Sequence, residues 1–330
     1  MSPSVERAPA GTVTTLDNQP PADVPASDDV DAATLGDFPD PFVLREGSAY
    51  YAFATGTRGR NIQAARSLDL KRWRTLPDVL PALPDWADTQ KGLTWAPAVF
   101  RRRDRFVLYY TARDRVSGFQ CISRAVSLRP DGPYRDDSAE PFVCQVSGAT
   151  PFCGSIDPSP FVATDGTPYL LWKSDENSAA CGKPPRIWVQ PMTDEGLALR
   201  ENATSLLSMD QGWEMPVVEG PSMLVRDGSY YLFYSANWYE SASYAVGYAH
   251  CTGPTGPCRK ATGESPFLHT AGAVVGPGGQ QFFDDPQGHL WMAFHAWGRP
   301  TATYRDGGMR LLRLEPMTFE NGAPVLQAVP

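Results

Sequence analysis

Three acidic residues each stand at the start of an apolar segment, next to a proline or a Gly-Pro pair. They are Asp40 in DFPDPF, Asp157 in SIDPSPF and Glu219 in VVEGPSM. An acid beside an apolar strand is costly unless it is solvated, paired or used in chemistry. If the three converge, their repulsion raises at least one carboxyl pKa towards a value suited to a general acid. One protonated acid and one ionised base are what the hydrolysis of a glycosidic bond requires.

An internal repeat explains why these acids should converge. Five segments share a short strand, a polar turn and an aromatic strand, and their anchor positions recur roughly every 60 residues. The anchors are residues 41, 97, 160, 221 and 281, and each stands nine residues before Tyr50, Phe106, Tyr169, Tyr230 or Leu290. Asp-Gly pairs at 165–166 and 227–228 predict hairpins. The second strands, such as YYLFYS, are apolar enough to be buried on both faces.

Five such units of four strands predict an all-β fold, a five-bladed β-propeller over residues 36–330. A β-sandwich or an open solenoid is the alternative architecture. The innermost strand of each blade would line a central channel, where Asp40, Asp157 and Glu219 would meet. The second unit carries Trp95-Ala96-Pro97 at this place, and the fifth carries Gly279-Gln280. The acids predicted to form turns instead are Asp37, Asp165, Asp227 and Asp285.

Composition narrows the class of protein and its compartment. The 330 residues carry a net charge of −8, which argues against a nucleic-acid partner, and no apolar run is long enough to span a membrane. Residues 1–35 lack hydrophobic periodicity and predict a flexible leader without an apolar signal core; the cysteines, rather than this leader, lead us to expect that an export signal was removed. Six cysteines without C-x-x-C spacing predict disulfides and secretion, with free buried thiols as the alternative. The expected pairs are Cys251–Cys258, Cys153–Cys181 and Cys121–Cys144.

Four motifs in order resemble those of glycoside hydrolase family 43, the arabinanase and xylosidase-type five-bladed propellers. They are Asp40-Pro41, Trp95-Ala96-Pro97, Ile156-Asp157-Pro158 and Glu219-Gly220-Pro221, and the resemblance covers roughly residues 36–320. It implies an inverting mechanism in which Asp40 is the general base and Glu219 the general acid. Asp157 would hold Glu219 in place and favour its protonated form. Inversion needs the base and the acid about 6.5–9.5 Å apart, with a water between them.

The resemblance also implies further site residues. His295 in FHAW matches a fifth-blade histidine that in some members lies beside a calcium ion, and a hydrogen-bonded core histidine is the alternative. We expect no cofactor to be required beyond such a structural calcium. Gly279 in GPGGQQ stands where arabinan-cleaving relatives have a histidine. The residues expected to contact substrate are Trp95, Trp238, Gln280 and Arg310.

The expected activity is that of a monomeric, exo-acting α-L-arabinofuranosidase on arabinose- or xylose-containing oligo- and polysaccharides. A β-xylosidase or an endo-1,5-α-arabinanase is the alternative, but many xylosidase relatives continue into a C-terminal β-sandwich that this sequence lacks. A non-catalytic carbohydrate-binding propeller would lack the axial acids. A fructan-cleaving propeller would carry Arg-Asp-Pro in the third blade, where Ile156 precedes Asp157.

Overall fold

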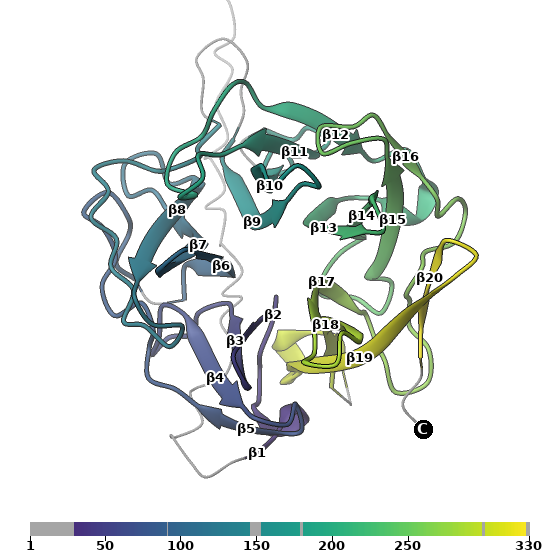
Figure 1. Ribbon diagram of the computed structural model, residues 1–330, viewed down its shortest axis with the longest axis horizontal. Helices are drawn as coiled ribbons and strands as arrows, with labels where there is room; N and C mark the ends of the chain where they lie inside the picture. The colour runs from purple at the N-terminus through teal and green to yellow at the C-terminus, as the bar shows by residue number, and fades with distance from the viewer. Residues whose placement is uncertain (1–29, 91, 146–152, 179–180, 299–300, 328–330) are drawn as a thin grey trace, which may run out of the picture.

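Five antiparallel sheets surround one axis, as Figure 1 shows, and the chain is the five-bladed β-propeller that the repeat predicts. The computed structural model describes residues 30–90, 92–145, 153–178, 181–298 and 301–327. None of the helices in these ranges is long and apolar enough to traverse a bilayer. The first strand of each repeat lies innermost and the aromatic strand lies second, so the repeat units are the blades.

The first two blades depart from four strands. The first sheet contains β1 (Val30–Asp31), β2 (Phe42–Glu46), β3 (Ala49–Ala54), β4 (Gln63–Ser67) and β5 (Arg72–Thr75). The second contains β6 (Thr94–Arg102), β7 (Arg105–Arg113) and β8 (Gln120–Ser127). Within the described residues this second sheet has three strands, and isolated bridges from β8 to Arg135 and Val143 continue it outwards.

The other three blades have the four strands expected. The third contains β9 (Ser155–Val162), β10 (Pro168–Ser174), β11 (Arg186–Pro191) and β12 (Thr204–Ser208). The fourth contains β13 (Val218–Arg226), β14 (Ser229–Ala236), β15 (Ala245–Cys251) and β16 (Cys258–Lys260). The fifth contains β17 (Gly278–Asp284), β18 (Leu290–Trp297), β19 (Arg310–Glu320) and β20 (Ala323–Leu326). Short 3₁₀ helices are η1 (Ala32–Thr34), η2 (Gly212–Glu214) and η3 (Tyr304–Asp306).

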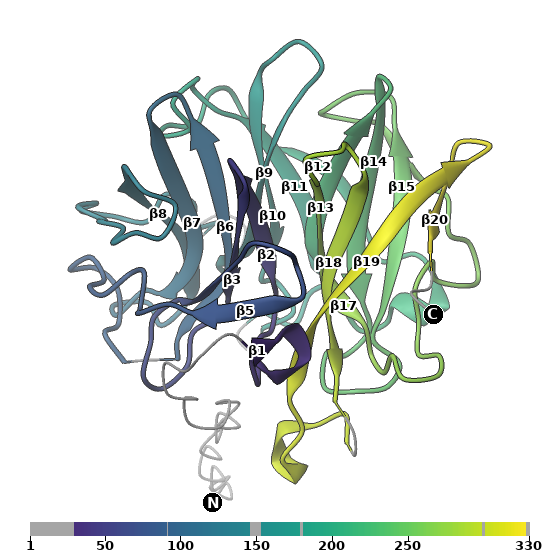
Figure 2. The ribbon, with the colours of Figure 1, turned by 60° about the horizontal axis from the view of Figure 1, so that its bottom comes forward.

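The predicted boundary of the leader differs from the structure. Strand β1 pairs with β5 on the outside of the first blade, as Figure 2 shows, and Leu35 is buried against that blade. Residues 30–35 therefore take part in the propeller. The outer strand that they add has only two residues, which is too short for a periodic pattern to reveal it. The rest of the predicted leader lies outside the described residues.

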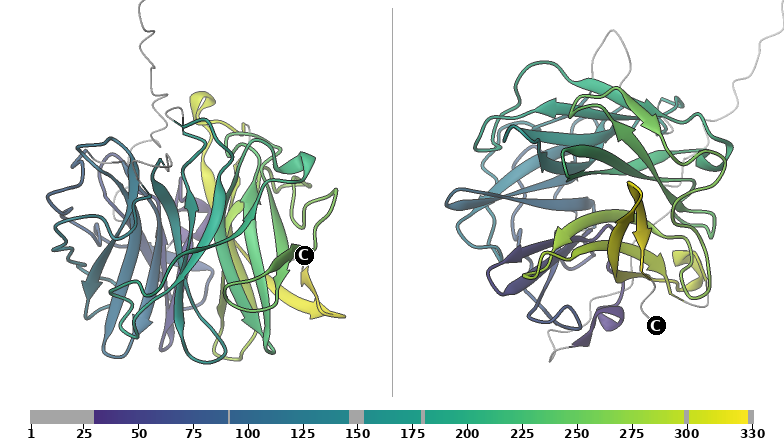
Figure 3. Two further views of the ribbon diagram at one scale, coloured as in Figure 1. Left: turned by 90° about the horizontal axis from the view of Figure 1, so that it is seen from above. Right: turned by 45° about the vertical axis from the view of Figure 1, so that its right-hand side comes forward.

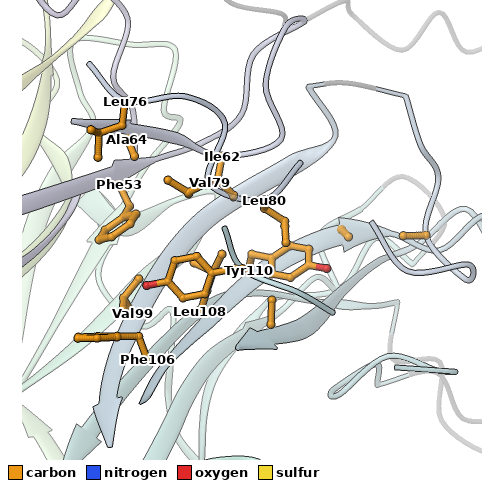
Figure 4. Close-up of a cluster of buried hydrophobic side chains, with 14 of the residues drawn as sticks. Phe53, Ile62, Ala64, Leu76, Val79, Leu80, Val99, Phe106, Leu108 and Tyr110 are labelled. Atoms are coloured by element: carbon orange, nitrogen blue, oxygen red, sulfur yellow. The ribbon is translucent and has the colours of Figure 1, made fainter. Parts of the chain in front are cut away.

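Apolar side chains fill the space between neighbouring blades, which stand next to one another in the side view of Figure 3. Figure 4 shows the cluster between the first and second blades, where Phe53 of β3 and Leu108 and Tyr110 of β7 are fully buried. The aromatic second strands are thus covered on both faces, as their composition predicts. These clusters fix the angles at which the innermost strands meet the axis.

The ring closes between the first and fifth blades without a shared strand. The backbone N–H of Val43 donates to Gln281 Oε1 at 2.9 Å, and Phe38 N–H donates to the carbonyl of Arg310 at 2.7 Å. An apolar cluster containing Val43, Phe283 and Leu312 lies behind these contacts. All three predicted disulfides are present: Cys121–Cys144, Cys153–Cys181 and Cys251–Cys258.

Candidate active site

Each innermost segment contains one residue in the left-handed backbone region, next to the axis. These residues are Asp40, Ala96, Asp157, Gly220 and Gly279, with φ values of 53°, 44°, 57°, 53° and 62°. The pairing register shifts at this point in β6, β9, β13 and β17, so each strand forms a bulge there. Bulges re-aim side chains and occur frequently beside active sites.

A ring of hydrogen bonds between blades fixes these bulges. Each left-handed residue donates its backbone N–H to a side chain of the preceding blade. The pairs are Ala96 to Thr55 Oγ1 (2.9 Å), Asp157 to Thr111 Oγ1 (3.3 Å), Gly220 to Asp157 Oδ2 (2.8 Å), Gly279 to Ser235 Oγ (2.9 Å) and Asp40 to His295 Nδ1 (3.1 Å). The last pair closes the ring. The axial segments are therefore held by side chains far away in the sequence.

This ring corrects the alignment of the repeats. Asp157-Pro158 matches Asp40-Pro41, so the third-blade anchor is residue 158, two positions before the residue 160 that was expected. In the fifth blade the anchor is Gln280 instead of residue 281. Hairpin length contributes to the difference, because Ser159 pairs with Leu171 and Gln281 with Ala293, whereas Phe42 pairs with Phe53. The hairpin is one residue longer in the third and fifth blades than in the first, which accounts for the fifth-blade shift and for one of the two positions in the third.

The three candidate acids line one cavity of about 620 Å³ on the axis. Trp95, Trp238, Gln280 and Arg310 line the same cavity, and His295 does not. Trp238 is 43% exposed at the mouth, whereas Trp95 is partly buried and donates Nε1–H to Gly92 O at 3.3 Å. The folded chain thus brings together every residue that the sequence assigned to catalysis or substrate contact.

Asp40 lies in an environment that favours its ionised form. Thr55 Oγ1 donates to Asp40 Oδ2 at 2.6 Å, and Arg310 donates an N–H to Oδ1 at 3.2 Å. Burial opposes ionisation, but the Arg310 guanidinium and the Thr55 hydroxyl hold the pKa of Asp40 below its ordinary value. The chain therefore keeps a carboxylate at this position in neutral solution.

Asp157 lies in the opposite environment. Burial and the neighbouring Glu219 carboxylate raise the pKa of Asp157 to about 7, although Lys173 opposes the shift. Tyr244 donates its hydroxyl to Glu219 Oε1 at 2.8 Å, and Lys173 Nζ lies 3.5 Å from Glu219 Oε2. A carboxylic proton is therefore retained beside Glu219 up to about pH 7, within a cluster that also fixes the Glu219 side chain.

His295 makes the hydrogen bond of the core-histidine alternative, and a calcium ion beside it stays a prediction. Its Nδ1 accepts the Asp40 N–H, and burial lowers the pKa of the imidazole to about 3, so the ring is neutral. In a neutral imidazole whose Nδ1 accepts, Nε2 carries the proton. The ring also stacks on Tyr244, with 5.9 Å between centroids. Among the described residues, no group of three or more His, Cys, Asp or Glu side chains could hold a metal ion.

Two expected substrate contacts already have protein partners. Gln280 accepts from Ser235 Oγ at 2.8 Å and donates to Gly220 O at 2.7 Å, so its amide ties the fifth blade to the segment that carries Glu219. Arg310 donates to Asp40 and to Tyr304 Oη. Both side chains line the cavity, and their contact with a sugar stays a prediction.

Sequence reasoning missed several residues of the site. Asp37, predicted to form a turn, is buried and accepts from Arg310 N–H at 2.7 Å and from Tyr304 Oη at 3.1 Å. Burial raises the pKa of Asp37 to about 6. Tyr244 and Lys173 were also missed. Nothing local identifies these residues except the polar Lys173 inside the otherwise apolar YLLWKS, which could have signalled a buried ion pair.

Two consecutive glycines of the fifth blade make room for the residues beneath the acids. A Cβ on Gly279 would lie 2.7 Å from His295 Nδ1 and 3.1 Å from Asp40 Cα, and a Cβ on Gly278 would overlap the Tyr244 ring. Steric exclusion of a side chain therefore explains why position 279 is glycine here.

Gly279→Ala is expected to destabilise the protein more than Gly288→Ala. Both glycines have positive φ, where alanine costs about 1–2 kcal/mol. Nothing lies within 4 Å of a Cβ on Gly288, so the clash at Gly279 should add about 1–3 kcal/mol. Urea unfolding of both variants measures the difference. Equal stabilities would mean that the His295 imidazole and the Asp40 backbone can move away from the added methyl group without loss of stability.

The propeller and its axial acids define a class, the glycoside hydrolases that use paired carboxyl groups. The family model for glycosyl hydrolases family 43 matches residues 34–324, and the chain belongs to this family. It is therefore a glycosidase.

Comparison with individual proteins agrees with the match to the family model. The chain is 24% identical over 307 residues to extracellular endo-α-(1→5)-L-arabinanase 1 of Bacillus subtilis, covering 86% of each. It superposes on a thermostable family-43 glycoside hydrolase with a TM-score of 0.78 and 28% identity, over 90% of this chain and 95% of that one. For an endo-1,4-β-xylanase of Bacteroides thetaiotaomicron the TM-score is 0.74 and the identity 30%, over 89% and 95% of the two chains.

Proposed function

We propose that this glycosidase releases L-arabinofuranose from arabinose-containing glycans, acting at chain ends with inversion of configuration. The observation that carries the proposal is the contrast between Asp40, ionised beside Arg310, and the protonated carboxyl group beside Glu219 in the same cavity. Hydrolysis of a glycosidic bond needs one carboxyl group in each state. Similarity to an arabinanase supports arabinose as the sugar. Release of xylose is the second candidate, favoured by the 30% identity to a xylanase.

Each axial acid has a separate task in this mechanism. Asp40 accepts a proton from the attacking water, and Arg310 and Thr55 orient its two oxygens. Glu219 gives a proton to the leaving oxygen, while Tyr244 and Lys173 hold its carboxyl group. Asp157 shares one proton with Glu219 and, by accepting the Gly220 N–H, fixes the adjoining backbone.

Asp157→Asn is expected to move the alkaline limb of the kcat/KM profile to lower pH. In the unmodified protein this limb reports the loss of the proton held by the two facing carboxyl groups, at about pH 7. In the variant the repulsion between the two carboxylates, which favours the shared proton, is absent. Initial rates between pH 4 and 9 measure the limb, with Asp165→Asn in a surface turn as the control. An alkaline limb at its original pH contradicts the tuning role of Asp157.

Product analysis tests the proposal as a whole. The protein is incubated with nitrophenyl α-L-arabinofuranoside, nitrophenyl β-D-xyloside, linear arabinan and xylan, and the released sugars are identified. Arabinose as the main early product from the first and third substrates is expected. Mainly long oligosaccharides from arabinan would replace exo- with endo-action, and xylose release alone would select the second candidate.

We also propose that the protein acts outside the cell, as a monomer. Three disulfides support this location, because such bonds persist mainly in oxidising compartments.

A further inference from the structure

One wall of the cavity is polar and comes from the second and third blades. Gln120, the first residue of β8, is 7% exposed, and Asn177 and Ser178 follow β10 on the next loop. All three residues line the same cavity as the axial acids. None of them belongs to the four motifs that identify the family.

The hydrogen bonding of this wall is incomplete. Within the described part of the chain, Gln120 Oε1, Asn177 Oδ1 and Ser178 Oγ are buried and have no hydrogen-bond partner. A buried polar atom without a partner costs about 1–3 kcal/mol, so native proteins retain few of them. Rotation about the last side-chain bonds would turn each group towards the cavity that it lines. A ligand with hydroxyl groups would satisfy all three.

Disulfides hold the wall in place. Cys121–Cys144 joins the residue after Gln120 to the outer part of the second blade, and Cys153–Cys181 joins the start of the third blade to the loop that carries Asn177 and Ser178. The carbonyl of Gly154 also accepts the N–H of Asp175 at 3.0 Å. One covalent link thus holds the strand that begins at Gln120 and the other holds the loop, as expected of a binding surface that must keep its shape.

The wall lies on the side of the cavity where the candidate acid is. Lys173 Nζ lies 3.5 Å from Glu219 Oε2 and 3.1 Å from Asp175 Oδ1, and Asp175 also lines the cavity. Asn177 and Ser178 come two and three residues later. The candidate base, in contrast, is bound by Arg310 of the fifth blade. Groups beyond the acid meet the sugar that leaves, because the acid faces the leaving oxygen.

We propose that Gln120, Asn177 and Ser178 form a subsite for the sugar unit on the leaving-group side of the scissile bond. This inference rests on the proposed function. The ligand is a neutral pentose unit, whose adjacent hydroxyl groups can both donate to and accept from two amides and one hydroxyl. A nitrophenyl leaving group has no hydroxyl groups to offer and gains little from this wall.

The test compares two substrates that carry the same arabinosyl group but different leaving groups. In the double variant Asn177→Ala, Ser178→Ala, kcat/KM for 1,5-α-L-arabinobiose should fall about tenfold, from the loss of two neutral hydrogen bonds. The value for nitrophenyl α-L-arabinofuranoside should stay within about twofold, because that substrate does not use the wall. Gln120→Ala should show the same selectivity. Asn202→Ala, at an exposed position, is the matched control and should change neither value.

The outcomes separate this inference from the proposed function. Equal losses on both substrates would show that the wall supports the site as a whole, and no loss on either would show that no sugar binds there; each overturns the subsite. If the unmodified protein cleaves neither arabinoside but cleaves nitrophenyl β-D-xyloside, the arabinose assignment fails. The effects of the variants are then compared between xylobiose and nitrophenyl β-D-xyloside. If the unmodified protein cleaves no substrate, the proposed function and the subsite both fall.

Discussion

Asp40→Asn is expected to lower kcat by about 10²–10⁴-fold, and by a similar factor for every leaving group. The amide cannot accept the proton of the attacking water, and this step does not depend on which group departs. Measurements of kcat with nitrophenyl and dinitrophenyl glycosides and with a disaccharide test both statements. Asp285→Asn, in the exposed turn between β17 and β18, should retain full activity.

The Asp40 variant should fold but lose stability. Arg310 and Thr55 donate to different oxygens of Asp40, so the single amide oxygen of asparagine can accept from only one of them, and the buried Arg310 also loses the charge that it faces. Thermal unfolding should therefore begin at a lower temperature, with an unchanged circular dichroism spectrum below the transition. A folded variant whose turnover stays within tenfold of the original would remove Asp40 from the role of general base.

Glu219→Gln is expected to lower kcat by a factor that depends on the leaving group. For a disaccharide, whose alkoxide needs a proton to depart, the loss should be about 10²–10⁴-fold. For a dinitrophenyl glycoside, whose phenolate departs without protonation, the loss should be far smaller. The ratio of the two losses distinguishes the acid from the base, since Asp40→Asn should give a ratio near one.

Glutamine at position 219 keeps the shape of the side chain, so the fold should be preserved. Its amide can still accept the Tyr244 hydroxyl, and its neutrality leaves Lys173 with Asp175 as a partner. Glu201→Gln, on the exposed surface after β11, is the control and should behave as the unmodified protein. Equal losses on activated and natural substrates would contradict the role of Glu219 as general acid.

Much of the fold could be predicted because its information is local. Apolar second strands, Asp-Gly turns and a period near 60 residues specify five similar hairpins. The cysteine pairs were predictable for the same reason, since each joins positions within 28 residues of one another. The register of the third blade was not, because one extra residue in its hairpin moves the bulge away from the position that a fixed offset predicts.

The acids could be found from the sequence, but their partners could not. Asp40, Asp157 and Glu219 each carry a motif in their own blade. Arg310 is 270 residues away from the carboxylate that it orients, and nothing around it indicates that contact.

The sequence by itself determined the number of blades, the inner hairpin of each blade and the three carboxyl groups that reach the axis, because these follow from short motifs that recur along the chain. Only the tertiary structure decided that the pKa of Asp40 is lowered and that of Asp157 is raised. Closing the ring places Arg310 beside Asp40, and Glu219 beside Asp157, within the same buried cavity. The protonation of a carboxyl group depends on burial and on the charges within a few ångströms, and folding alone brings these neighbours together.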